Sequence, residues 1–83
     1  MEKLLVTLSV PALEERYDIF VPQDVPIGKV IEVMVNGVRD LSDERYQTSG
    51  HEMLSSSRLE LPLRKDRTLN AYGIRDGESL ILI

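Results

Sequence analysis

The sequence predicts an α+β fold in which one main helix packs on a mixed sheet of four to five strands. Three observations lead to this prediction. Apolar residues alternate at period two before Pro22, recur at spacings of three and four after Pro26, and form a run of four in the closing SLILI. With 83 residues, the chain is expected to form a single domain spanning 1–83.

The first two segments predict a hairpin. LLVTLSV places Leu4, Val6, Leu8 and Val10 on one face of a strand that ends at Pro11. RYDIFV repeats the alternation through Tyr17, Ile19 and Val21, and Pro22 ends it. Because the two segments are separated by a short turn, we expect them to pair with each other.

The stretch QDVPIGKVIEVMVNGVRDL allows two interpretations. Branched residues and the dipeptide Asn36-Gly37 favour a hairpin. Pro26 suits a first helical position, and the spacing of three and four continues across Gly37. We therefore predict a helix over about residues 26–40, with its end left open between Gly37 and about Leu41.

The remainder predicts irregular strands and turns. SDERYQTSG is a polar loop, HEMLSSS a weak strand, and RLELPL a strand that Pro62 confines to a sheet edge or an irregular path. A short helical turn is expected near residues 69–72, with Gly73 left-handed after it. Asp76-Gly77 forms the next turn, and SLILI is the closing strand.

Composition excludes several kinds of site. The chain contains no cysteine, so thiolate metal sites and disulfides are excluded, and a cytoplasmic location is expected. The net charge of −4, with basic residues scattered except in LRKDR, argues against nucleic-acid binding. No segment is long and apolar enough to span a bilayer.

Catalytic signals are also lacking. His51 is the only histidine, and the five glycines form no phosphate-binding motif. Acidic pairs such as Glu14-Glu15 lie in polar loops, where nothing raises a carboxyl pKa. We therefore predict no enzymatic activity, no cofactor and no metal site.

The closing segment RTLNAYGIRDGESLILI is similar to that of the ubiquitin-like β-grasp family, and the resemblance extends over nearly the whole chain. In that family, the last strand lies in the middle of the sheet, parallel to the first. The resemblance therefore implies an interior position for the apolar ILI, where strands on both sides and the helix would cover it.

A narrower resemblance is to the small YukD/EsaB-type proteins of Gram-positive type VII secretion systems. It is carried by the helix opening DVPIGKVIEVM and by GIRDGESLILI, which stops on the strand. This resemblance implies a non-conjugated accessory or regulatory component that binds membrane-associated secretion machinery.

Two alternatives remain open. A ubiquitin-like modifier or sulfur carrier acts through a Gly-Gly tail, whose lack of Cβ atoms lets the chain thread a narrow enzyme channel. The chain ends on Leu82-Ile83, so conjugation would require a tail missing from this sequence. The other alternative is a ubiquitin-like domain of a larger membrane transporter.

Candidate contact residues follow from period two. If Leu80 and Leu82 face the helix, then Ile81 and Ile83 lie on the open sheet face, near Leu5. We predict Leu5, Ile81 and Ile83 as protein contacts, with Met53 or Leu54 nearby; burial of this strip in a homodimer is an alternative. A weaker candidate is the basic turn of Arg64, Lys65 and Arg67, which suits an acidic partner.

Overall fold

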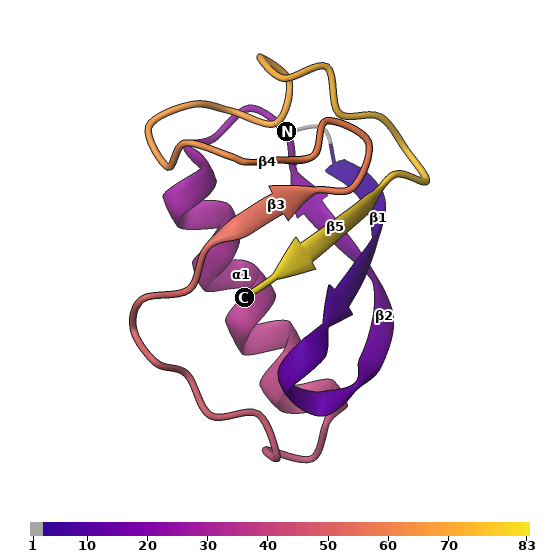
Figure 1. The fold of residues 1–83 in the computed structure, drawn as a ribbon, viewed down its shortest axis with the longest axis vertical. Helices are drawn as coiled ribbons and strands as arrows, with labels where there is room; N and C mark the ends of the chain where they lie inside the picture. The colour runs from indigo at the N-terminus through magenta and orange to yellow at the C-terminus, as the bar shows by residue number, and fades with distance from the viewer. Residues whose placement is uncertain (1–2) are drawn as a thin grey trace.

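The computed structural model describes residues 3–83, which form a five-stranded sheet packed on one α-helix (Figure 1). The elements are β1 (Lys3–Val10), the 3-10 turn η1 (Pro11–Leu13), β2 (Glu15–Pro22), α1 (Ile27–Leu41), β3 (Leu54–Ser56), β4 (Leu61–Pro62) and β5 (Ser79–Leu82). The predicted hairpin is confirmed, since β1 pairs with β2 from Lys3–Pro22 to Val10–Glu15.

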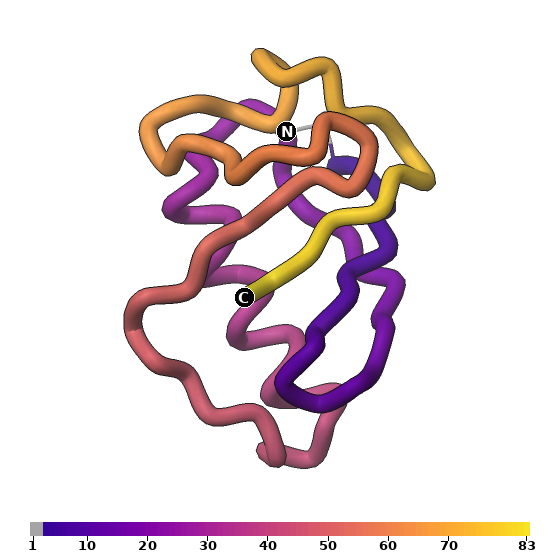
Figure 2. The backbone as a smooth tube through the Cα atoms, viewed as in Figure 1, coloured from indigo at the N-terminus to yellow at the C-terminus, as the bar shows by residue number. Residues whose placement is uncertain are grey.

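The closing strand is interior. The strand order is β2-β1-β5-β3-β4, with β5 parallel to β1 and antiparallel to β3. Figure 2 shows this last segment, in yellow, passing between the first strand and the third. Strands therefore flank β5 on both sides, as the resemblance implied.

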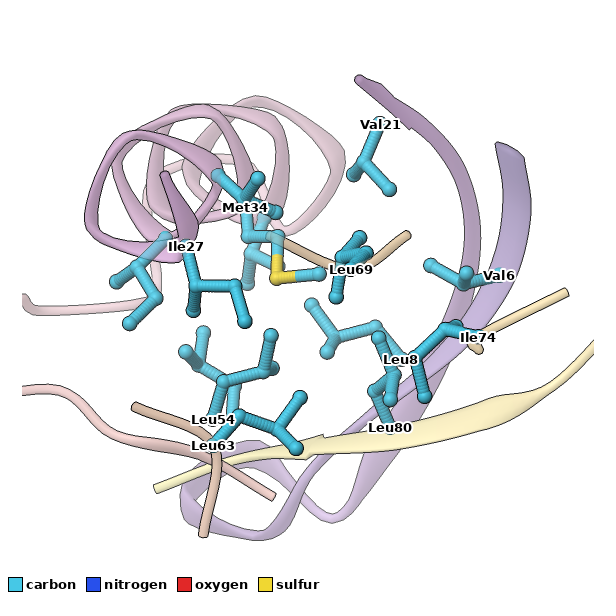
Figure 3. Packing of buried hydrophobic residues seen from close by; sticks show 14 of the residues in the cluster. Val6, Leu8, Val21, Ile27, Met34, Leu54, Leu63, Leu69, Ile74 and Leu80 are labelled. Carbon is cyan, nitrogen blue, oxygen red and sulfur yellow. The ribbon is translucent and has the colours of Figure 1, made fainter. Parts of the chain in front are cut away.

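The core lies between the sheet and α1. Leu8 from β1 and Leu80 from β5 are fully buried and point toward Met34 of α1 (Figure 3). Leu54 of β3 and Leu69 of the segment between β4 and β5 are buried in the same cluster. The inward residues of the alternating strands thus meet the apolar stripe of the helix, which accounts for the two periods in the sequence.

The helix runs through Gly37. It buries Ile27, Val30, Ile31, Met34 and Val38 and ends at Leu41, which settles the boundary that the sequence left open. The N–H groups in the first turn of a helix have no partner within the helix. Here those of Ile27 and Gly28 donate to carbonyls of another segment, Arg67 O (2.7 Å) and Lys65 O (3.1 Å).

Replacing Gly37 with alanine is expected to stabilise the fold by about 0.5–1 kcal/mol, because glycine in a helix interior costs that much relative to alanine. A Cβ at this position meets nothing within 4 Å. The matched variant Gly73→Ala is expected to destabilise by about 1 kcal/mol, because Gly73 has φ +70°. Urea denaturation measures both; shifts of the same sign would contradict this assignment of backbone roles.

Residues 69–73 form the short helical turn that was predicted. The N–H groups of Tyr72 and Gly73 donate to Leu69 O and Asn70 O at 3.1 and 3.0 Å, and Ile74 N–H also returns to Leu69 O. The last of these bonds closes the turn, and the chain leaves it after Gly73. The predicted left-handed conformation of Gly73 is confirmed.

Candidate interaction surface

The sheet has one face that α1 does not cover, and apolar side chains gather at one end of it. Leu80 and Leu82 are buried, whereas Ile81 is half-buried and Ile83 is 70% exposed. The segment that leads into β3 adds Met53, whose side chain is 47% exposed. Period two along β5 therefore divides its residues between core and surface, as predicted.

Backbone pairing holds these side chains together. Met53 N–H donates to Ile83 O at 2.8 Å, and Ile83 N–H donates back to Met53 O at 2.9 Å. Beyond β3, Pro62 of the edge strand β4 is exposed and lies opposite Ser55, on the same face as Ile81. It lines a shallow hollow of about 390 Å³ together with Ile81 and Ile83. We call the set Met53, Pro62, Ile81 and Ile83 the sheet-face patch.

Leu54 is not a surface residue. The sequence offered Met53 or Leu54 as a contact, but Leu54 is fully buried and pairs with Leu82 in the sheet. Figure 3 shows its side chain within the core, close to Leu63. The strand places Leu54 on the inner face, so Met53 alone is available to a partner.

Leu5 lies apart from the patch, contrary to the predicted strip. The parallel register aligns Ser9 with Ile81, whereas Leu5 lies beside Gly77, whose N–H donates to Leu5 O at 2.8 Å. Four residues of β1, roughly 13 Å of strand, therefore separate the level of Leu5 from that of Ile81. The intervening surface is polar.

Phe20 is an exposed apolar residue that the sequence reasoning missed. It pairs with Leu5 across the hairpin, and it is 63% exposed compared with 36% for Leu5. The hydrogen bond from Thr7 Oγ1 to Asp18 Oδ1 (2.8 Å) lies one step along the same face. Period two already placed Phe20 opposite Tyr17, Ile19 and Val21, so the signal was present in the sequence.

The basic turn borders the patch and also supports the helix. Arg64 forms a two-pronged contact with Asp66, at 3.0 and 2.9 Å, and this hydrogen bonding lowers the pKa of Asp66. Lys65 and Arg64 line a hollow of about 530 Å³ together with His51 and Met53. The turn thus places positive charge beside Met53, while the carbonyls of Lys65 and Arg67 bond the first turn of α1.

A buried carboxylate joins the two ends of the loop before β3. Glu52 is 5% exposed and accepts hydrogen bonds from Tyr46 Oη (2.9 Å), Thr48 Oγ1 (2.5 Å) and Ser49 N–H (3.0 Å). The sequence analysis interpreted residues 42–50 as a polar loop and placed Glu52 at the start of a weak strand, so it missed the network. These hydrogen bonds hold residues 46–52 together around Glu52, and Tyr46 is itself buried in the core.

These contacts shift two pKa values in opposite directions. Burial of Glu52 favours its neutral form, but the three donors outweigh burial and lower its pKa below the ordinary 4.5. Burial, followed by the bond to Glu52, raises the pKa of Tyr46 to about 12. The stabilisation from this network is therefore fully present between about pH 4.5 and about pH 10, the ordinary pKa values of the two groups.

Replacing Glu52 with glutamine is expected to destabilise the protein at pH 7 by about 1–3 kcal/mol, because buried donors lose their charged acceptor. Since the pKa of Glu52 is lower in the folded state, its stabilisation is present above pH 4.5 and is lost as pH falls through the folded pKa. Urea denaturation from pH 7 to pH 3 should therefore show a smaller loss for Glu52→Gln than for the wild type. Parallel pH profiles would contradict this.

Among residues 3–83, no group of three or more His, Asp or Glu side chains is placed to hold a metal ion. No buried side-chain polar atom in this range lacks a hydrogen-bond partner. In this region, no helix is long and apolar enough to cross a membrane.

The fold and its apolar open face define a ubiquitin-like protein of the β-grasp class. By sequence, residues 5–82 match the family described as WXG100 protein secretion system (Wss), protein YukD, and the chain belongs to this family. It is therefore a ubiquitin-like component of type VII secretion. Comparison with curated proteins gave no match.

Solved structures agree on the fold. The ubiquitin-like domain of the Mycobacterium tuberculosis type VII secretion system protein EccD1 matches with a TM-score of 0.77 and 20% identity, covering 100% of this chain and 99% of that one. The EccD5 ubiquitin-like domain from Mycobacterium xenopi gives 0.72 and 19%, covering 100% and 94%. A chain of the MycP5-free ESX-5 inner membrane complex gives 0.71 and 16%, covering 100% of this chain but 21% of that one.

Proposed function

We propose that this protein works without catalysis, by offering the sheet-face patch to a protein of the type VII secretion machinery on the cytoplasmic side of the membrane. The complex is noncovalent. The observation that carries this proposal is the exposure of Met53 and Ile83, side by side on a face that the domain's own helix does not cover. Large apolar side chains gathered on a small domain are typical of docking sites.

The patch has the layout of a binding hot spot on a small scale. Ile81, Ile83 and Pro62 line the hollow, together with Ser55 of β3. A partner that inserts one apolar side chain into this hollow removes the surface of that side chain and of the hollow from water. This burial stabilises the complex by about 25 cal/mol per Å² of apolar area. Arg64 is already paired with Asp66, so Lys65, at the Met53 side, is the charge that favours a partner with an acidic residue beside that anchor.

The comparison with the ESX-5 complex supports membrane-associated machinery as the source of the partner. There, a chain within an inner membrane complex includes a region similar to this one. A separate ubiquitin-like protein of the same secretion class could occupy an equivalent position by docking, in place of being part of the longer chain.

Affinity capture from the host that encodes the protein tests the proposal. A tagged wild type should recover a secretion component under native conditions and release it in denaturant. Deletion of the gene should reduce secretion of the system's substrates. Recovery of no secretion component, together with unchanged secretion in the deletion strain, would overturn the proposal.

The alternative function, a covalent modifier or sulfur carrier, can be tested on the same native protein. Intact-mass analysis of the native protein, followed by incubation with adenylating enzyme and ATP, should show no thioester or thiocarboxylate. An adduct that survives denaturation, or a longer species that ends in Gly-Gly, would identify a modifier or sulfur carrier.

A further inference from the structure

The strand β2 forms an edge of the sheet, and its outer backbone is open. In β1, Thr7 N–H donates to Glu78 O and Leu5 O accepts from Gly77, so odd-numbered backbone groups face β5. Even-numbered groups of β1 therefore face β2, and the antiparallel register gives their bonds to Tyr17 and Ile19. The backbone N–H and C=O groups of Arg16 and Asp18 consequently point outward from the sheet edge.

The charges on this edge would be complementary if the β2 strands of two copies paired antiparallel. Arg16 and Asp18 flank Tyr17, and both are exposed on the open face of the sheet, opposite Ser9 and Thr7. An antiparallel copy centred on Tyr17 brings Arg16 opposite Asp18 twice, once on each side of the twofold axis. These are also the residues whose backbone groups are free to form the new ladder.

Other registers are worse. Centring on Asp18 or on Arg16 sets like charges directly opposite each other, which is unfavourable on a sheet. Centring on Ile19 places Asp18 against Phe20 and leaves Arg16 without an acidic neighbour. Centring on Glu15 sets Arg16 opposite Glu14, but Glu14 lies outside β2 and has φ +54°, so it is not extended. Among registers within β2 centred on residues 15 to 19, the Tyr17-centred pairing alone satisfies both the backbone alternation and the charges.

We propose that β2 pairs with β2 of a second copy, antiparallel and centred on Tyr17, so that two sheets join into one. Asp18 already accepts Thr7 Oγ1–H at Oδ1 (2.8 Å), which fixes its carboxylate on the open face and leaves Oδ2 for the guanidinium of Arg16 from the second copy. No ion pair within residues 3–83 engages Arg16. This surface is separate from the sheet-face patch, so the dimer and the proposed partner complex can be tested independently.

Charge reversal tests the register. Sedimentation equilibrium of the purified wild type should show a concentration-dependent dimer. Arg16→Asp and Asp18→Arg should each weaken dimerisation at least about 10-fold, because both symmetry-related contacts become repulsive. An equimolar mixture of the two variants should recover a heterodimer, seen by native mass spectrometry, since the two acidic side chains flanking Tyr17 in one variant then face the two basic side chains of the other.

Three results would overturn the proposal: a wild type that stays monomeric at millimolar concentration, a charge-reversed variant that dimerises like the wild type, or a mixture that forms no heterodimer. Circular dichroism melting controls for folding. Both positions are exposed, so the variants should melt close to the wild type.

Discussion

Replacing Leu80 with alanine is expected to lower the free energy of unfolding by about 2–5 kcal/mol, the cost of removing a buried leucine side chain and leaving a cavity. Leu80 is fully buried, and its strand pairs with both β1 and β3. A domain of this size has a total stability of roughly 4–12 kcal/mol, so this one substitution removes a large part of it. Urea denaturation followed by circular dichroism measures the loss.

Ile83→Ala is the matched control. It removes an aliphatic side chain near the same end of the chain, but from a residue that is 70% exposed, so a loss below about 1 kcal/mol is expected. Equal losses for the two variants would show that the final residues do not divide between core and surface as the sheet requires.

Replacing Met53 and Ile83 together with glutamate is expected to weaken binding of the captured secretion component by about 30-fold or more, equivalent to about 2 kcal/mol. Two carboxylates would be buried against an apolar partner surface, and desolvation of unpaired charge is costly. Isothermal titration calorimetry with the recovered partner measures the change.

Val33→Glu is the control for this experiment. Val33 is 44% exposed, similar to Met53, but lies on the outer side of α1 instead of the open sheet face. Glutamate is also a good helix former, so folding should be preserved. If Val33→Glu weakens binding as much as the patch substitutions, the partner docks on the helix and the sheet-face patch is not the site.

The sequence predicted well which side chains of the long strands face the core. It predicted poorly which residues of different strands lie side by side. Alternation alone sent Leu80 inward and Ile83 outward, because period two is a property of each strand. The separation of Leu5 from Ile81 depends on the register of β1 with β5, strands distant along the chain. No local pattern encodes that register, so the predicted contact strip was wrong at Leu5.

The predictions for Leu54 and for Glu52 failed for reasons that lie within short segments of the chain. β3 is only three residues long, so alternation could not decide which of Met53 and Leu54 faces inward. Glu52 resembled a solvated carboxylate, because its burial depends on Tyr46 and Thr48 approaching it across a loop. The helix was predicted more closely, since its apolar stripe continues on both sides of Gly37.

The closing strand is an interior member of the sheet that also carries part of the proposed docking surface, and residue-resolved amide hydrogen exchange tests its interior position most directly. The amide of Ile83 donates to Met53 O at 2.9 Å, and Leu80 and Ile81 pair with both β1 and β3. Amides bonded within β5 should exchange only when the whole domain unfolds, far more slowly than those of the exposed stretch around Gly50. Exchange in β5 as rapid as in that stretch would contradict an interior closing strand.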